Sequence, residues 1–238
     1  NDLTLSLFLF HSIDEEERIA KSIFNTNLVD GVIITADRKE DSFVAQIQQR
    51  DIPVAFVGKP EPNVDVPYVN VDNVAGGFMA TQHLIGRGCS RVATIMVSHN
   101  TAGEDRFAGY CSALETAGMS LDESLIAEGD FSRESGYKAM QRLLPAKPDA
   151  VFIASDLMAS GAQSAIREAG LRIPEDIAMV GFDDLPGAVE ARVPLTTIRQ
   201  PIEQMGPLAV DLLQAQINEI PDKVQSCILP VDLVVRSS

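Results

Sequence analysis

Tryptophan is absent from this sequence of 238 residues, and aromatic side chains make up only 5% of it. Basic residues are also scarce, since 19 lysines and arginines stand against 34 aspartates and glutamates, for a formal net charge of −15. Phosphate backbones and anionic lipids are bound by clustered cations. The composition therefore argues against direct contact with DNA or an acidic membrane surface, and it indicates a solvated acidic exterior.

Cysteine occurs three times, at Cys89, Cys111 and Cys227. The number is odd and no CxxC or CxxH spacing is present, which predicts a reducing compartment and no metal site. No apolar run is long enough to span a membrane, and no signal peptide is visible. We therefore expect a cytoplasmic protein without a membrane-spanning segment.

Catalytic motifs are missing as well. The sequence contains no GxSxG, P-loop or HExxH pattern, and its histidines, His11, His83 and His99, lie far apart. Gly86-Arg-Gly88 superficially suggests a phosphate-binding loop, but it follows a predicted helix, where a C-terminal cap is the better interpretation. We expect no enzymatic activity, no cofactor and no metal.

What the sequence does contain is a regular alternation of short apolar runs and helical patterns, with 45% hydrophobic residues for a substantial core. The alternation predicts an α/β fold with parallel sheets, and the number of units favours two similar subdomains over one sheet. Strands are expected at residues 3–10, 30–35, 53–57, 68–71, 91–97, 125–128, 150–154, 177–182, 195–199 and 228–235. Helices are expected at residues 12–27, 42–50, 74–85, 103–117, 132–143, 156–168 and 202–218.

Polar pairs follow two of the expected strands. Ser155-Asp156 comes directly after the run at residues 150–154, and Asp183-Asp184 follows the run at residues 177–182. Ligands bind beyond the carboxyl ends of strands in open parallel sheets, so these four residues are the first candidates for a binding site. For Asp183 a purely structural role, as a helix cap or loop carboxylate, is the alternative.

Two further residues are candidates. Arg106 lies early in the helix expected at residues 103–117, where a cation opposes the helix dipole. It either forms a surface ion pair with Glu104 or Asp105, or it binds a ligand. Phe131 stands in a polar loop, where its ring either packs on the core or stacks against the C–H face of a sugar.

These residues belong to a set of motifs that resembles the effector-binding region of the lactose-repressor/galactose-repressor (LacI/GalR) family of bacterial transcription regulators. Each motif is weak alone, but together they follow the family's order over nearly the whole chain. The matching segments are Val71-Asp-Asn-Val-Ala-Gly-Gly77, His83-Leu-Ile-Gly-Arg-Gly88, Arg106-Phe-Ala-Gly-Tyr110, Phe152-Ile-Ala-Ser-Asp156 with Met158-Ala159, Ile173-Pro-Glu-Asp-Ile177 with Val180-Gly-Phe-Asp-Asp184, and Pro194-Leu-Thr-Thr-Ile-Arg-Gln200.

The resemblance implies a periplasmic-binding-protein type I fold, in which two Rossmann-like α/β subdomains share three crossovers and bind a small molecule between them. It places the crossovers near residues 98–101, 198–200 and 227–229. The expected subdomains are residues 1–98 with 200–227, incomplete at its start, and residues 99–199 with 228–238.

The resemblance also implies roles for individual side chains. Arg106 matches the family's arginine for ligand hydroxyls, and Asp183 matches its carboxylate partner. Phe131 matches an aromatic stacking position, and Gln200 lies at a crossover facing the cleft. Ser155 occupies a position where the family often has asparagine. The expected ligand-binding residues are Arg106, Asp183, Phe131, Ser155, Asp156 and Gln200.

Two departures from the family pattern stand out. The N-terminal helix-turn-helix and hinge helix are absent from this sequence, so we expect operator DNA to be a partner only through that absent domain. The sequence also begins at the family's second strand, without the first strand and the first helix.

The leading hypothesis is the effector-sensing domain of a homodimeric repressor that responds to a neutral sugar. Vicinal hydroxyls satisfy the donors of Arg106 and the acceptors of Asp183 together, whereas a phosphate would bring negative charge toward Asp183 and Asp156. The homodimer is expected from the family and from the small residues at positions 159–165, which permit close approach. The alternative is a periplasmic sugar-binding receptor of the same fold. A third hypothesis, a nucleotide-dependent enzyme, lacks any phosphate-binding fingerprint.

Overall fold

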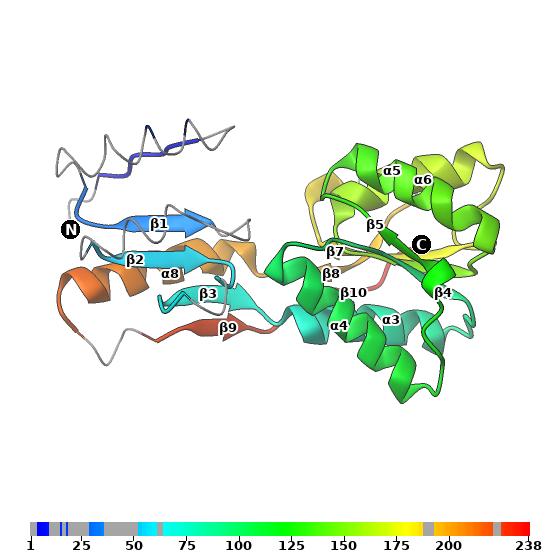
Figure 1. Ribbon diagram of the computed structural model, residues 1–238, viewed down its shortest axis with the longest axis horizontal. Coiled ribbons are helices and arrows are strands. Elements are labelled where there is room, and N and C mark those ends of the chain that lie inside the picture. The colour runs from blue at the N-terminus through cyan, green and yellow to red at the C-terminus, as the bar shows by residue number, and fades with distance from the viewer. Residues whose placement is uncertain are drawn as a thin grey trace.

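The computed structural model describes residues 4–9, 15, 18, 29–35, 52–60, 64–187, 193–220 and 225–238. The described strands form two sheets that lie side by side (Figure 1). Nearly all neighbouring strands run parallel, with helices against the sheets, so the predicted α/β class is confirmed.

The first sheet has four parallel strands in the order β1-β2-β3-β9. Helix α8 (Ile202–Ile217) packs against β1, β2 and β3. The Gln216 side chain joins this helix to the backbone of Val54 through hydrogen bonds of 3.3 and 2.7 Å. The strands are β1 (Val32–Thr35), β2 (Val54–Val57), β3 (Tyr68–Val71) and β9 (Cys227–Leu229).

The second sheet has six strands in the order β10-β8-β7-β6-β4-β5, with β10 antiparallel to β8 at one edge. These strands are β4 (Val92–Met96), β5 (Ile126–Glu128), β6 (Ala150–Ile153), β7 (Ala178–Asp183), β8 (Thr196–Arg199) and β10 (Asp232–Val234). Short 3-10 helices, η1 (Glu123–Leu125) and η2 (Leu144–Ala146), precede β5 and β6.

Helices cover both faces of the second sheet (Figure 1). One face carries α3 (Asn73–Gly86) and α4 (Thr101–Thr116), and the other carries α5 (Arg133–Leu143) and α6 (Asp156–Glu168). Val151 and Ile153 of β6 belong to the core under α5 and α6, whereas Phe152 belongs to the core under α3 and α4. Because both faces of β6 are buried, its sequence is a continuous apolar run and not an alternating one.

The chain passes between the two sheets after β3, after β8 and between β9 and β10. The first passage corrects the expected subdomain boundary, which assigned residues 73–98 to the N-terminal subdomain. Helix α3 packs on the second sheet, and β4 is one of the strands of that sheet. Residues 73–98 belong with the second sheet because α3 packs closely against α4 on one face of that sheet. Residues 228–229, expected in the C-terminal subdomain, lie in β9 of the first sheet.

Two expected strands also differ. The structure assigns no strand to residues 4–9, where Leu5, Leu7 and Leu9 are exposed, because none of the described strands pairs with them to complete their backbone hydrogen bonds.

The expected strand at residues 228–235 divides into β9 and β10. Pro230 separates them, at the point where the chain changes sheets, and proline has no N–H to continue a ladder. The helices expected at residues 12–27 and 42–50 lie outside the described residues, apart from Glu15 and Arg18, which are helical.

Glycines allow α3 and α4 to approach closely. A Cβ atom at Gly77 of α3 would lie 2.1 Å from the carbonyl oxygen of Arg106 in α4. A Cβ atom at Gly109 of α4 would lie 2.1 Å from the carbonyl oxygen of Val74. Real Cβ contacts are essentially never this short. Both positions must therefore be glycine for the two helices to pack at this distance.

The same device joins α5 and α6. A Cβ atom at Gly161 would lie 1.9 Å from the carbonyl oxygen of Arg133, and one at Gly136 would lie 2.1 Å from that of Met158. The small residues expected to favour a dimer contact are therefore used inside the chain. Those of them that are buried are Ala159, Gly161, Ala162 and Ala165.

Candidate functional site

The strand order of the second sheet reverses at β4. Strand β4 pairs with β5 on one side and with β6 on the other. Helix α4, which follows β4, packs with α3, whereas α6, which follows β6, packs with α5 on the opposite face. The connections therefore diverge beyond the carboxyl ends of β4 and β6, which is where open parallel sheets bind ligands.

Arg106 lies at this point, near the start of α4, and is only 5% exposed. Its Nη1 donates to the carbonyl oxygen of Ala154, directly after β6, at 2.5 Å. The same nitrogen lies 3.5 Å from Oδ1 of Asp183, and the guanidinium carbon lies 3.6 Å from the ring centroid of Phe182. Because Nη2 donates to none of the described residues, the guanidinium retains hydrogen-bonding capacity for a ligand.

Asp183 is the last residue of β7, and its carboxylate is held by several donors. Nε2 of Gln200 donates to Oδ1 at 2.6 Å, the charge of Arg106 lies beside it, and the backbone N–H of Asp156 faces the carboxylate. Burial raises the pKa of Asp183, although these three partners oppose the shift. The structure thus brings Arg106, Asp183 and Gln200 together from three distant parts of the chain.

Strained backbone gathers at the same edge of the sheet. Six described residues other than glycine have positive φ, and four of them lie here. They are His99 after β4 at 57°, Phe131 after β5 at 66°, and Asp183 and Asp184 at the end of β7 at 118° and 61°. Residues other than glycine rarely adopt positive φ, and such strain concentrates at functional sites. This concentration is a second reason, separate from the sequence motifs, to place the candidate site at the carboxyl edge.

Phe131 and Ser155 lie at this edge and also have structural roles in the fold. Phe131 is half-buried and packs against the core under α5 and α6. Ser155 is buried and caps α6, because its Oγ accepts from the backbone N–H of Met158 at 3.3 Å. Its hydroxyl proton remains available, since it donates to no residue that the structure describes.

Asp156 has an internal role that the sequence did not predict. Its Oδ1 accepts from the Thr197 hydroxyl at 2.6 Å, and its Oδ2 accepts from the backbone N–H of Leu185 at 2.9 Å. The carboxylate, only 5% exposed, joins the start of α6 to β8 and to the loop after β7. We therefore assign Asp156 a structural role, holding the loop that carries Asp183 and Asp184, in place of the expected ligand contact.

Asp156 predicts a specific pH dependence of stability. Burial raises its pKa to about 7 against the hydrogen bonds from Thr197 and Leu185, and the neighbouring Asp183 and Asp184 raise it further. An aspartate in an unfolded chain has a pKa of about 3.9. Between about pH 4 and 7, Asp156 therefore holds a proton in the folded protein that it has lost in the unfolded chain. The contribution of this group to the free energy of unfolding therefore falls as pH rises through that window.

Urea denaturation at the two ends of this window measures the effect. The fall in unfolding free energy with rising pH should be smaller in the Asp156→Asn variant than in the unsubstituted protein. Equal falls in the two proteins would show that another group is responsible.

A loop of the first sheet reaches the same edge. Oγ1 of Thr101, the first residue of α4, donates to the carbonyl oxygen of Lys59 after β2 at 2.8 Å. Nζ of Lys59 lies 3.4 Å from Oδ2 of Asp105. These contacts place the carboxyl end of β2 opposite the start of α4. They also neutralise the Lys59 cation, as Asp183 neutralises that of Arg106.

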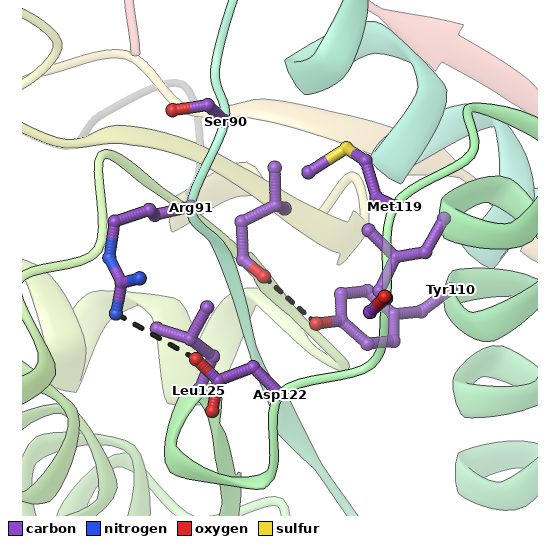
Figure 2. Close-up of a pocket in the computed structure, with 9 residues that line it drawn as sticks. Ser90, Arg91, Tyr110, Met119, Asp122 and Leu125 are labelled. Carbon is purple, nitrogen blue, oxygen red and sulfur yellow. Dashed lines mark hydrogen bonds and ion pairs between the residues drawn. The ribbon is translucent and has the colours of Figure 1, made fainter.

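A separate cavity of about 240 Å³ lies near the amino end of β4, away from these residues (Figure 2). Tyr110 donates to the carbonyl oxygen of Val92 at 2.8 Å across it, and Arg91 lies 3.8 Å from Asp122 at its rim. These polar groups are engaged within the chain, and none of the six expected ligand-binding residues lines the cavity.

Within the described residues, no three or more histidine, cysteine, aspartate and glutamate side chains are grouped to hold a metal ion. None of the described helices is long and apolar enough to cross a membrane. All three cysteines are free thiols.

Two residues of the site escaped prediction from sequence. Asn73 accepts from Nε of Arg106 at 2.8 Å, and Phe182 lies under the guanidinium plane. Sequence signals for both exist, because Asn73 closely follows the end of β3 and Phe182 directly precedes Asp183. Asp72 by itself accounts for the start of the helix, which hides the role of Asn73 at the level of the sequence.

Comparison with known proteins adds independent information. The model of one family, described as a periplasmic binding protein-like domain, matches residues 81–238. The chain is 39% identical over 229 residues to the HTH-type transcriptional regulator CelR of Thermobifida fusca, covering 94% of this chain and 67% of CelR. It is 35% identical over 230 residues to the HTH-type transcriptional repressor PurR of Escherichia coli O139:H28, again covering 94% of this chain and 67% of the relative.

Solved structures agree with these matches. A transcriptional regulator CelR–cellobiose complex superposes with a TM-score of 0.92 at 39% identity, covering 95% of this chain and 71% of that one. A regulatory protein of the LacI family from Chloroflexus aggregans superposes with a TM-score of 0.87 at 31% identity, covering 95% and 83%.

Proposed function

Since this chain belongs to the LacI family of bacterial transcription regulators, we propose that it is the effector-sensing domain of a repressor that responds to a neutral sugar. The observation that carries the proposal is the ion pair of buried Arg106 with the largely buried Asp183 at the strand reversal. Nη2 of the arginine donates to none of the described residues and is left for a ligand. The 39% identical CelR is described in complex with cellobiose, which supports a sugar as the ligand class.

The charges around the site support a neutral ligand. The described cations at this edge each face a carboxylate. Arg106 pairs with Asp183 and Lys59 with Asp105, while Arg199 and Arg236 both pair with Asp184. A phosphate would have to displace one of these partners and would meet the further carboxyl group of Asp156. A sugar hydroxyl both donates and accepts a hydrogen bond. It can therefore bind Arg106 and Asp183 without changing the net charge of the site.

We assign direct hydrogen bonds with the sugar to Arg106, Asp183 and Gln200, which are already joined in one cluster. Phe131 offers an aromatic face at the same edge, and the Ser155 hydroxyl proton offers one further donor. Phe182 does not stack on the ligand in this proposal, because it is fully buried and covered by the guanidinium.

Regulation follows from linkage. A ligand that binds one arrangement of the two sheets better than another shifts the protein toward that arrangement. The chain covers 67% of CelR and of PurR. We propose that DNA binding belongs to a helix-turn-helix region outside this sequence.

Isothermal titration calorimetry tests the proposal. Cellobiose is the first probe, followed by monosaccharides, phosphorylated sugars and purines. We expect a neutral sugar to bind, and we expect Arg106→Met and Asp183→Asn each to weaken its binding by roughly 1.5–3 kcal/mol, because each removes a charged hydrogen-bonding partner. Arg172→Met is the matched control, because Arg172 pairs with Asp176 on the surface.

Circular dichroism of each variant establishes that it is folded before titration. Binding of a phosphorylated sugar or a purine, with no response to any neutral sugar, would overturn the assignment of ligand class.

The proposal extends to assembly and location. We propose a homodimer in the cytoplasm without enzymatic activity. The relatives are transcription regulators, which gives no support to a periplasmic receptor or a nucleotide-dependent enzyme. The homodimer rests on the family resemblance alone, because the small residues of α6 are occupied by α5. The molar mass from light scattering decides it.

A further inference from the structure

Asn73 is a buried amide beside the candidate site. It is 2% exposed and is the first residue of α3, where the chain enters the second sheet from β3. Capping of α3 does not require it, because the Asp72 side chain already accepts from the backbone N–H of Ala75 at 2.8 Å. A buried amide costs free energy unless its donors and acceptor are satisfied, so its partners explain its presence.

The partners of Asn73 fix its orientation. Oδ1 accepts from Nε of Arg106 at 2.8 Å, and a guanidinium only donates, so the oxygen must face the arginine. Nδ2 donates to the carbonyl oxygen of Val71 and to Oδ1 of Asn70, both at 3.3 Å. The hydrogen bonds of the amide are therefore directed at two places, the end of β3 and Arg106.

Arg106 depends on this contact for its direction. Its Nη1 is held by Ala154 and Asp183, and Asn73 holds Nε. Two anchored nitrogens define the plane and rotation of a guanidinium, so the third, Nη2, is aimed by the other two. Without Asn73 the group would pivot about Nη1.

We propose that Asn73 is a positioning residue that aims Arg106 at the effector and fixes it relative to the end of β3. Its consequence for ligand affinity rests on the proposed function, whereas its effect on Arg106 does not. A series of contacts runs from Asn70 in β3 through Asn73, Arg106 and Asp183 to Gln200. The effector site is thereby joined to the first sheet and to the passage after β8.

The first test observes Arg106 itself, without a ligand. In ¹⁵N nuclear magnetic resonance spectra, the Nε–H of Arg106 should exchange slowly with solvent, unlike that of the exposed Arg172. Asn73→Ala should lose this protection, whereas Asn73→Asp keeps an acceptor and should retain it. Thr81→Val is the matched control, because Thr81 is a buried residue of the same helix whose hydroxyl donates to the carbonyl oxygen of Gly77 and not to Arg106. Retention of protection in Asn73→Ala, or fast exchange in the unsubstituted protein, would overturn the proposal.

The second test is a double-mutant cycle on cellobiose affinity. Asn73→Ala should weaken binding about tenfold when Arg106 is present and less than about twofold in an Arg106→Met background. A merely structural role predicts the same weakening in both backgrounds, which would refute positioning through Arg106. If neither cellobiose nor any other sugar binds the unsubstituted protein, the proposed function fails, while the resonance of Arg106 still decides the role of Asn73.

Discussion

Replacing Gly77 with alanine should lower the free energy of unfolding by about 3 kcal/mol and weaken effector binding as well. The added Cβ would lie 2.1 Å from the carbonyl oxygen of Arg106 and 3.1 Å from its Cα. These are backbone atoms, which cannot rotate aside as the end of a flexible side chain can. Helices α3 and α4 must therefore separate, and the displacement carries the Arg106 guanidinium away from Ala154 and Asp183.

Gly86→Ala is the matched control, because Gly86 is the last residue of the same helix and its Cβ would meet nothing within 4 Å. This substitution should leave stability unchanged or raise it by up to about 1 kcal/mol, since alanine is the better helix former. Urea denaturation followed by circular dichroism suits a protein without tryptophan. Equal unfolding midpoints for the two variants would mean that the close approach of α3 and α4 does not constrain the fold.

Asp184→Asn should be at least as damaging, with an expected loss of about 3–5 kcal/mol. The Asp184 side chain is 8% exposed; its Oδ2 accepts from Nε of Arg199 at 2.6 Å, and its Oδ1 accepts from Nη2 of Arg236. The Arg236 side chain is itself only 14% exposed. Removing the carboxylate leaves that cation buried without its counter-charge, which costs more than the ion pair contributes.

The pH dependence of this interaction has the opposite sign to that of Asp156. Burial opposes ionisation of Asp184, but the hydrogen bonds and charges of Arg236 and Arg199 outweigh it and hold the pKa below its usual range. The stabilisation is therefore present above the pKa of an unfolded aspartate and is lost as pH falls through the folded value. Acid should destabilise the unsubstituted protein more than the Asp184→Asn variant.

Asp176→Asn provides the control for Asp184. Asp176 pairs with Arg172, whose side chain is 69% exposed, and surface pairs contribute only about 0–1 kcal/mol. Equilibrium unfolding of both variants across acid and neutral pH measures the difference. Similar losses in the two variants at neutral pH would show that burial of the Asp184 cluster adds nothing.

Local features of the fold were predictable from sequence because their causes lie within a few residues of each other. The helix expected at residues 156–168 has those bounds in the structure, and Gly170 after it has the positive φ of 77° that a C-terminal cap requires. Asp72 caps α3 as its position before the apolar pattern indicates. In each case periodicity and a capping residue are read from one short segment.

The location of the site was also partly predictable, because parallel strands bring their carboxyl ends to one edge. That rule selected Asp183, and the family motifs added Arg106 and Gln200, which the structure brings into contact with it. The rule about strand ends could not distinguish a carboxylate that binds the ligand from one that has a structural role. Asp156 lies beyond the carboxyl end of its strand and Asp183 is the last residue of β7, yet the oxygens of Asp156 are taken by Thr197 and Leu185.

Only the tertiary structure decided on which sheet α3 packs and which residue Asn73 contacts. Helix α3 could follow β3 on the first sheet by sequence order, but Gly77 and Gly109 let it pack backbone to backbone against α4 on the second. Asn73 gains its role because that packing brings it to Arg106, 33 positions further along the chain. Propensity and motif act within a segment, whereas close packing and buried hydrogen bonds select among the ways that segments meet.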